Sequence, residues 1–357
     1  MKSAADGHRL RTPGPLLDLV EHLLRGLAGV PDAKIVILIS PELNYFQHPH
    51  TQLKDLAAEL SLNIPGAPSF PEQLGFIAIP YSQGGSVFTN TIIFHELGHF
   101  VFEQLSKWDD IAGPAEQALK TWSQFSTLMP ADQQWCRDRL RSWAEETFCD
   151  LFALGLVGPA YAFASIELFS LLGILDEESS KDFQSSHPAH GFRFREHLIQ
   201  LRSHGWWSEI ARLQTDHIKL IKERSALPET TYRFPEGPKR LIRCFLRMRR
   251  SIRKLVHEVI GNQLETLTSF RKQRLAIQEC LLNGVVPSAL GETEDKDIRV
   301  AIINASACVY LASLSKLVQK VRGRSSHNLA DRSEMARRLE MWTMKALEDC
   351  MLLTGRR

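Results

Sequence analysis

The residues from His95 to His99 form the pattern HExxH, which is typical of zinc hydrolases. In a helix, His95 and His99 stand one turn apart on the same face, so both imidazoles can reach one metal ion. Glu96 is not needed as a ligand, and its carboxylate can take a proton from a water bound to the metal. Apolar residues at 92–94 and 100–102 surround the pattern. They predict a buried helix and disfavour a surface helix that carries two histidines and an acid.

A catalytic zinc site needs a third protein ligand, and residues 143–150 offer one. Glu146 and Asp150 are four residues apart on a predicted helix and point the same way. We predict that Glu146 completes the metal shell and that Asp150 accepts the free N–H of a ligand histidine. Glu145 is the alternative ligand, but its partner four residues on is Cys149, a poorer orienting group. The apolar residues around these acids argue against a solvated helix edge, because buried carboxylates usually need a metal or a charge partner.

A third cluster, His187-Pro188 followed by Arg193, has the spacing HPxxxxR. The order HExxH, ExxxD and HPxxxxR resembles the gluzincin zinc metallopeptidases, most closely the catalytic domain of the CAAX-prenyl-protease and heat-shock membrane-protease type. The resemblance covers roughly residues 75–195, about a third of the chain. It implies a zincin-like catalytic domain with a small sheet. HExxH with ExxxD is fairly specific, whereas the His-Pro element is weaker.

The resemblance also implies a role for each matching residue. By this resemblance, the ligands of one zinc ion per chain would be His95, His99 and Glu146. Glu96 would be the general base, and Asp150 would be the acid that orients a ligand histidine. His187 and Arg193 would support the cleft or stabilise the oxyanion. Several side chains remain open as the oxyanion donor, namely His187, Arg193, His190 and Tyr161. A strand at 85–89 would bind an extended peptide along its edge. The relatives that are embedded in membranes have clear spanning helices, and this chain shows none, which makes a membrane-lodged substrate doubtful.

The hydrophobic pattern places strands before the HExxH helix and mostly helices after it. Short β-branched or apolar runs predict strands at 34–40, 75–79 and 86–89, and 46–50 is interpreted as a polar loop despite its two histidines. Helical spacing predicts helices at 16–27, 52–62, 91–105, 114–128, 132–157, 160–175, 192–202, 208–224, 238–260, 263–282, 298–321 and 330–353. The fold class is therefore α+β and predominantly α. Length and a Pro-containing segment at 226–238 predict two domains, a zincin-like domain at 1–225 and a helical bundle at 226–357.

Composition limits the classes of binding partner and the cellular compartment that we expect for the protein. The chain has 357 residues, with 43 basic and 41 acidic side chains and a net charge of +2, which disfavours a general nucleic-acid binder. Its 6 cysteines are scattered without a CxxC pair, as in a reduced cytoplasmic protein. The start of the chain lacks the apolar core of a secretory signal. The apolar stretch at 151–175 is broken by Gly155, Gly158 and Pro159, so it reads as two buried helices rather than one membrane span.

The segment from Lys239 to Lys254 carries basic residues and no acid. Apolar and basic side chains fall on two separate stripes of the predicted helix. The simplest interpretation is a bundle helix with a solvated face. The functional alternatives are an acidic protein partner or an anionic surface; without interleaved aromatics, no specific nucleic acid is expected.

Two functions follow as hypotheses. The first is a soluble zinc endopeptidase that cleaves a specific protein substrate, with the helical C-terminal part in substrate or partner recognition. The alternative is a non-enzymatic, metal-containing scaffold that binds a partner through the basic helix. Glu96 favours the enzyme, because a purely structural metal site does not need it.

Overall fold

In a computed structural model of the chain, the described residues are 14–27, 34–40, 45–48, 74–80, 86–105, 108–173, 175, 186–213, 215–225, 236–261, 267–287, 298–323 and 328–354. The elements within them are α2 (Gly14–Arg25), β1 (Lys34–Ser40), β2 (Phe46–His48), β3 (Leu74–Pro80), η2 (Thr89–Ile92), α4 (Ile93–Leu105), α5 (Trp108–Lys120), η3 (Phe125–Thr127), α6 (Pro130–Val157), α7 (Pro159–Leu171), α8 (His190–Ser203), α9 (Trp206–Ile210), η5 (Ala211–Leu213), α10 (Asp216–Ser225), α11 (Glu236–Ile260), α12 (Leu267–Leu282), α13 (Ile298–Ala312), α14 (Leu314–Arg322) and α15 (Leu329–Thr354).

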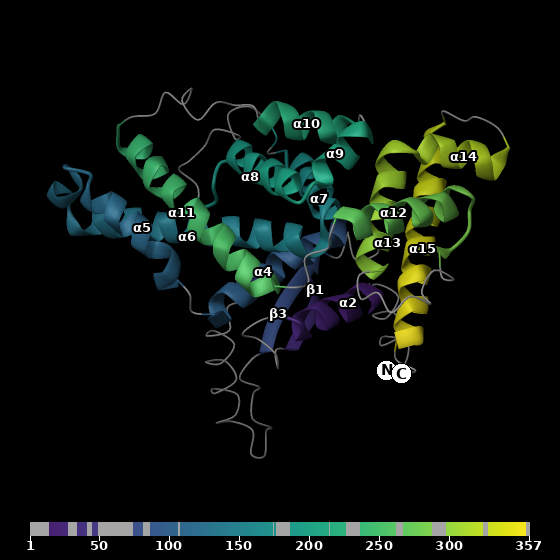
Figure 1. The fold of residues 1–357 in the computed structure, drawn as a ribbon, viewed down its shortest axis with the longest axis horizontal. Helices are drawn as coiled ribbons and strands as arrows, with labels where there is room; N and C mark the ends of the chain where they lie inside the picture. Colours follow the sequence, from purple (N-terminus) through teal and green to yellow (C-terminus); the bar gives the residue numbers. More distant parts are fainter. Residues whose placement is uncertain are drawn as a thin grey trace, which may run out of the picture.

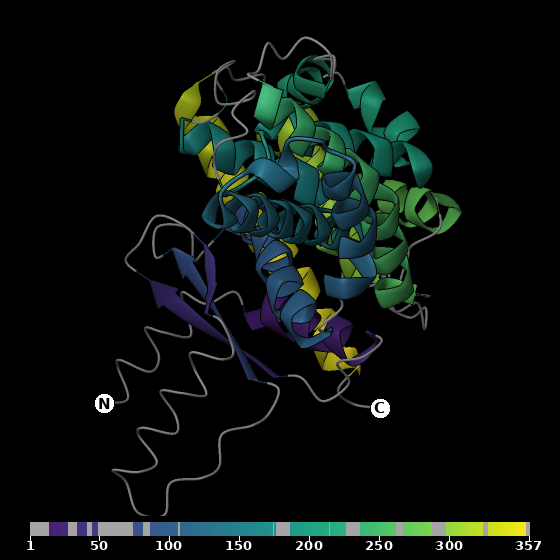
Figure 2. The same cartoon turned by 90° about the vertical axis from the view of Figure 1, so that its left-hand side faces the viewer.

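The described part of the chain is predominantly helical with one small sheet, as the sequence predicted (Figure 1). The sheet lies at one side of the helical body (Figure 2). The predicted helices recur with shifted ends, and three were predicted too long. The predicted helix at 114–128 divides into α5 and η3, 208–224 divides into α9, η5 and α10, and 298–321 divides into α13 and α14. The helix predicted at 52–62 lies outside the described residues.

The sheet has the strand order β1-β3-β2. β1 and β3, both predicted, pair in parallel with Lys34 opposite Leu74. β2 pairs antiparallel with β3, with Gln47 opposite Ile77. The prediction of a polar loop at 46–50 was therefore wrong for its first three residues. That run is too short for an alternating pattern to be visible, and pairing with β3 decides its conformation.

The predicted strand at 86–89 is also wrong. Residues 86–88 form a turn that leads into the 3-10 helix η2, and Gly85 lies outside the described residues. The Ser86 hydroxyl accepts a hydrogen bond from the Thr89 amide at 3.4 Å, and the Asn90 amide donates to the Ser86 carbonyl at 3.2 Å. The β-branched residues resemble a strand, but a serine that hydrogen-bonds the backbone three residues on favours a helix start. This segment is therefore not a strand edge for a peptide.

The HExxH helix α4 packs closely against α6, and both are buried where they cross. Residues 93–98 and 100–102 of α4 are buried, as expected of a core helix, whereas its last turn is partly exposed. The first half of α6 is largely exposed, whereas residues 146–157 are all buried. Gly98 sits at the crossing: a Cβ there would lie 2.8 Å from the Cα of Cys149. The missing side chain is what permits the close approach of the two helices.

The break predicted between two buried helices is confirmed at Gly158, which has a φ of 63° and precedes Pro159. The freed backbone groups are satisfied by Asn304 of α13. Its amide donates to the Val157 carbonyl at 2.9 Å, and its oxygen accepts from the Ala160 amide at 2.9 Å. Among the described residues, no single helix has the length and apolarity of a membrane span; α13 and α14 meet those criteria only as a pair, which is bent by 86°.

The basic helix α11 lies against α5 and α6 (Figure 1). Its predicted apolar stripe is buried, namely Leu241, Phe245, Met248, Ile252 and Leu255. Its predicted basic stripe is exposed, namely Arg240, Arg243, Arg247, Arg250 and Lys254. One hydrophobic cluster contains residues from both sides of segment 226–238. The two-domain division at 225/226 stays a prediction.

Candidate metal centre

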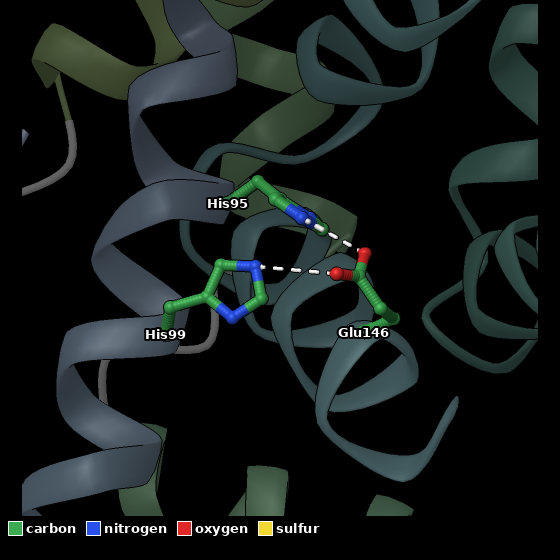
Figure 3. Close-up of side chains that lie close together, drawn as sticks. All are labelled: His95, His99 and Glu146. Carbon is green, nitrogen blue, oxygen red and sulfur yellow. Dashed lines mark ion pairs between the residues drawn. The ribbon is translucent and has the colours of Figure 1, made fainter. Parts of the chain in front are cut away.

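Side chains from α4 and α6 converge on one point (Figure 3). His95, His99 and Glu146 each offer one ligand atom, and these atoms all lie within 4.8 Å of one another. Nε2 of His95 is 3.4 Å from Oε2 of Glu146, and Nε2 of His99 is 3.5 Å from Oε1. The sequence predicted this group from two separate patterns, and the crossing of the two helices brings it together.

The group has the chemistry of a site for a metal ion. Ligand atoms ~2.0–2.1 Å from a tetrahedral ion lie ~3.4 Å from each other, close to the separations between the imidazoles and the carboxylate. Oε2 of Glu146 is buried and has no hydrogen-bond partner among the described residues; Nη2 of Arg193, at 3.8 Å, is too distant to donate to it. A buried carboxylate oxygen without a partner is costly unless a cation binds it. The residues therefore fit a bound metal ion.

Asp150 contacts His95 on the side away from Glu146, as the ExxxD pattern predicted, and is itself held by several buried side chains. Nδ1 of His95 lies 3.0 Å from Oδ1 of Asp150, which leaves Nε2 directed at Glu146. Arg193 donates to both oxygens of Asp150, from Nε at 2.7 Å and from Nη2 at 2.6 Å. The Tyr161 hydroxyl donates to Oδ1 at 2.5 Å, and Nε2 of His197 is 3.4 Å from Oδ2. This buried network fixes the tautomer and the direction of the His95 ring.

His99 is oriented in the same manner by a different acid. Its Nδ1 is 2.9 Å from Oε1 of Glu145. Glu145 was the alternative ligand in the sequence, and the structure places it behind His99 instead. Adjacent residues on a helix point about 100° apart, so Glu145 and Glu146 approach the histidines from different sides. Each histidine thus has one nitrogen facing Glu146 and the other facing a carboxylate.

The electrostatics favour a positive charge at the centre. Burial alone would lower the pKa of His95, but the close carboxylates of Asp150 and Glu146 raise it to about 10. Burial would raise the pKa of Glu146, and the neighbouring His187 and His95 hold it well below its usual range. Likewise, Arg193 overcomes the effect of burial on Asp150 and holds its pKa far below normal. The two buried carboxylates therefore stay ionised, and Glu146 carries its negative charge beside Nε2 of both histidines.

A cavity of about 530 Å³ opens beside the three ligand candidates. Glu96 lines it and is 7% exposed. His187 also lines it, with its side chain 52% exposed and its Nε2 3.1 Å from Oε1 of Glu146. His190 and Arg193 border the cavity, but both guanidinium hydrogen bonds of Arg193 go to Asp150, and its Nη2 is also 3.8 Å from Oε2 of Glu146. Of the predicted oxyanion donors, only His187 is largely exposed at the cavity; Tyr161 is buried in the Asp150 network.

Several residues of the site were missed from the sequence. Tyr45 and Gln47, at β2, line the cavity, and no local pattern marks them. His197 follows Arg193 by four residues on α8, and that helical spacing was a usable signal for a shared face. The chain matches no protein-family model, no curated protein and no solved structure.

Proposed function

We propose that the protein is a zinc-dependent endopeptidase that hydrolyses peptide bonds of a specific protein substrate. The observation that carries the proposal is the convergence of His95, His99 and Glu146 beside a cavity that Glu96 also lines. A structural metal site needs only its ligands. A further buried carboxylate at the same cavity is what hydrolysis requires, because it can accept the proton of the attacking water.

In the proposed reaction, His95, His99 and Glu146 would hold a zinc ion, which would supply Lewis-acid chemistry for the peptide carbonyl and the attacking water. Glu96 accepts the proton of the attacking water and passes it to the leaving amine. His187 donates an N–H to the oxyanion from the cavity side. Arg193 acts through Asp150, as a positioning residue that keeps His95 in place.

The surroundings of the cavity support a peptide as the substrate. Its wall includes the apolar side chains Ile92, Leu168, Phe169 and Leu172. β2 is an outer strand of the sheet, and Tyr45 and Gln47 place it at the cavity. An extended peptide that adds beside β2 would carry its scissile bond past Glu96, with an apolar side chain against the wall. β2 takes the role that the sequence assigned to residues 85–89.

The test measures zinc content and cleavage in matched variants. Glu96→Gln should bind one zinc per chain like the wild type and lose cleavage of a proteome-derived peptide library by about 10²–10⁴-fold. Glu103→Gln, on the same helix but outside the cavity lining, should retain both properties. Fragments are identified by mass spectrometry. A wild-type protein that binds zinc but cleaves neither the library nor proteins captured by Glu96→Gln contradicts the proposal and favours the metal-containing scaffold.

The ligand set is tested separately. Glu146→Ala should abolish stoichiometric zinc binding, because two histidines alone leave a tetrahedral site without its third protein ligand. Retention of one tightly bound zinc by Glu146→Ala contradicts the assignment.

A further inference from the structure

A second cavity, of about 110 Å³, lies between the end of α5 and the first half of α11. It shares no lining residue with the metal cavity. Its lining consists of Ala118, Thr121, Trp122, Arg240, Arg243, Cys244 and Arg247. Three of these side chains are arginines and none is an acid. The cavity therefore has a strongly positive lining.

The arginines of α11 divide into two sets. Arg249 and Arg253 face inward and pair with Glu196 of α8, whose side chain is 1% exposed. Those two charges are neutralised by ion pairs with α8. Arg240, Arg243 and Arg247 are exposed, and within the described ranges none of them forms an ion pair with a carboxylate.

The spacing of these three arginines favours the binding of an anion. Arg243 and Arg247 are four residues apart and Arg240 precedes Arg243 by three, so like charges are neighbours on one helix face. Such pairs repel each other weakly in the absence of an anion. Guanidinium groups present planar pairs of N–H donors that match the oxygens of a phosphate or carboxylate.

We propose that this cavity is an anion-binding site for a phosphoryl group carried by a protein partner. The concave shape accepts one compact group that projects from a chain. A flat lipid surface is a poorer fit, because none of the exposed large apolar side chains of the described residues lies on α11. The proposal is independent of proteolysis, since it concerns a different surface and binding alone.

Calorimetric titration of the full chain tests the site. The probes are a neutral peptide with one phosphoserine, the same peptide with serine, inorganic phosphate, and phosphatidylcholine vesicles with 30% phosphatidylserine. The phosphopeptide should bind saturably and more weakly as salt rises, while the serine peptide does not bind. Arg243→Gln should weaken binding about tenfold, as expected for one charge-assisted contact.

Arg250→Gln is the matched control, because it removes the same charge from the same helix face outside the cavity lining. It should change the affinity by no more than about twofold. Circular dichroism checks the fold of each variant. An equal loss in Arg250→Gln and Arg243→Gln overturns the site, as does the absence of saturable phosphopeptide binding. Binding of inorganic phosphate or vesicles without binding of the phosphopeptide overturns the proposal that a protein carries the phosphoryl group.

Discussion

Gly98 sets the distance between the two helices that carry the candidate metal ligands. In Gly98→Ala, the new Cβ would lie 2.8 Å from Cα, 3.0 Å from Cβ and 3.1 Å from Sγ of Cys149. Carbon atoms in favourable contact are ~3.5–4.0 Å apart, so α4 and α6 must separate by roughly 0.7 Å. Gly98 precedes His99 directly, so this displacement acts on the separation between the imidazoles and Glu146.

For Gly98→Ala, the expected change in unfolding free energy combines two opposing effects, and the change in zinc affinity follows from the displacement of the ligands. Overpacking costs about 1–3 kcal/mol, and alanine recovers about 1 kcal/mol over glycine in a helix. The metal-free protein should therefore lose about 0–2 kcal/mol of unfolding free energy. Metal sites tolerate displacements of about 0.2 Å in ligand distances, so zinc affinity should fall about 10–100-fold. The loss of affinity is the distinguishing effect.

Competition with a chromophoric chelator measures zinc affinity, and urea unfolding of the metal-free protein measures stability. Gly113→Ala is the matched control, because Gly113 lies within α5 and a Cβ there meets nothing within 4 Å. It should leave zinc affinity unchanged, and its stability should rise by less than the ~1 kcal/mol of an ordinary helical exchange of glycine for alanine, because Pro114 follows it and disfavours the helical conformation of a residue with a Cβ. Wild-type zinc affinity in Gly98→Ala would refute the argument that this contact sets the geometry of the site.

Three further predictions concern the surroundings of the site, all measured by urea unfolding of the metal-free protein. Asp150→Asn removes the carboxylate that accepts both hydrogen bonds of the buried Arg193 and should cost about 3–5 kcal/mol; a loss below 1 kcal/mol contradicts the network. Asn304→Ala leaves the Ala160 amide unsatisfied at the α6–α7 break and should cost about 2–4 kcal/mol, and an unchanged midpoint would show that another group serves this break. Burial lowers the pKa of His190 from 6.5 to about 4, so the unfolded chain binds more protons between these values and stability falls as pH drops from 6.5 to 4. His190→Gln should remove about 2 kcal/mol of that pH dependence, a figure reduced from the full pKa shift because solvent partly screens the side chain. Parallel pH profiles of the unfolding free energy in the wild type and the variant would contradict this prediction.

The candidate ligands were predictable because their signals are local. Four residues span about one helical turn, so the pairs His95 and His99, and Glu146 and Asp150, must each share a face once a helix forms. The apolar runs around both pairs indicate burial, and buried polar groups need partners. Strands β1 and β3 were equally clear, because their β-branched or apolar runs are bounded by breaks.

The errors fall where local and long-range interactions compete. Residues 86–89 have a strand-like composition, but the Ser86 hydroxyl and backbone turns draw them into a helix start. β2 exists because β3 offers it a hydrogen-bonding edge. The conformation of β2 is not encoded in a window of a few residues, since it depends on a partner strand elsewhere in the chain. The start of η2 is local, but its single serine contact was outweighed by the strand-like composition of the segment.

The sequence by itself determined which side chains can bind a metal and which helix face each occupies, because the helical period fixes those relations. Only the tertiary structure decided how they combine. It placed Glu146 toward both histidines and Glu145 behind His99, and it joined Arg193 to Asp150 across two helices. The physical reason is that these choices depend on the angle and distance at which α4, α6 and α8 pack. Those quantities are set by long-range contacts such as the one at Gly98.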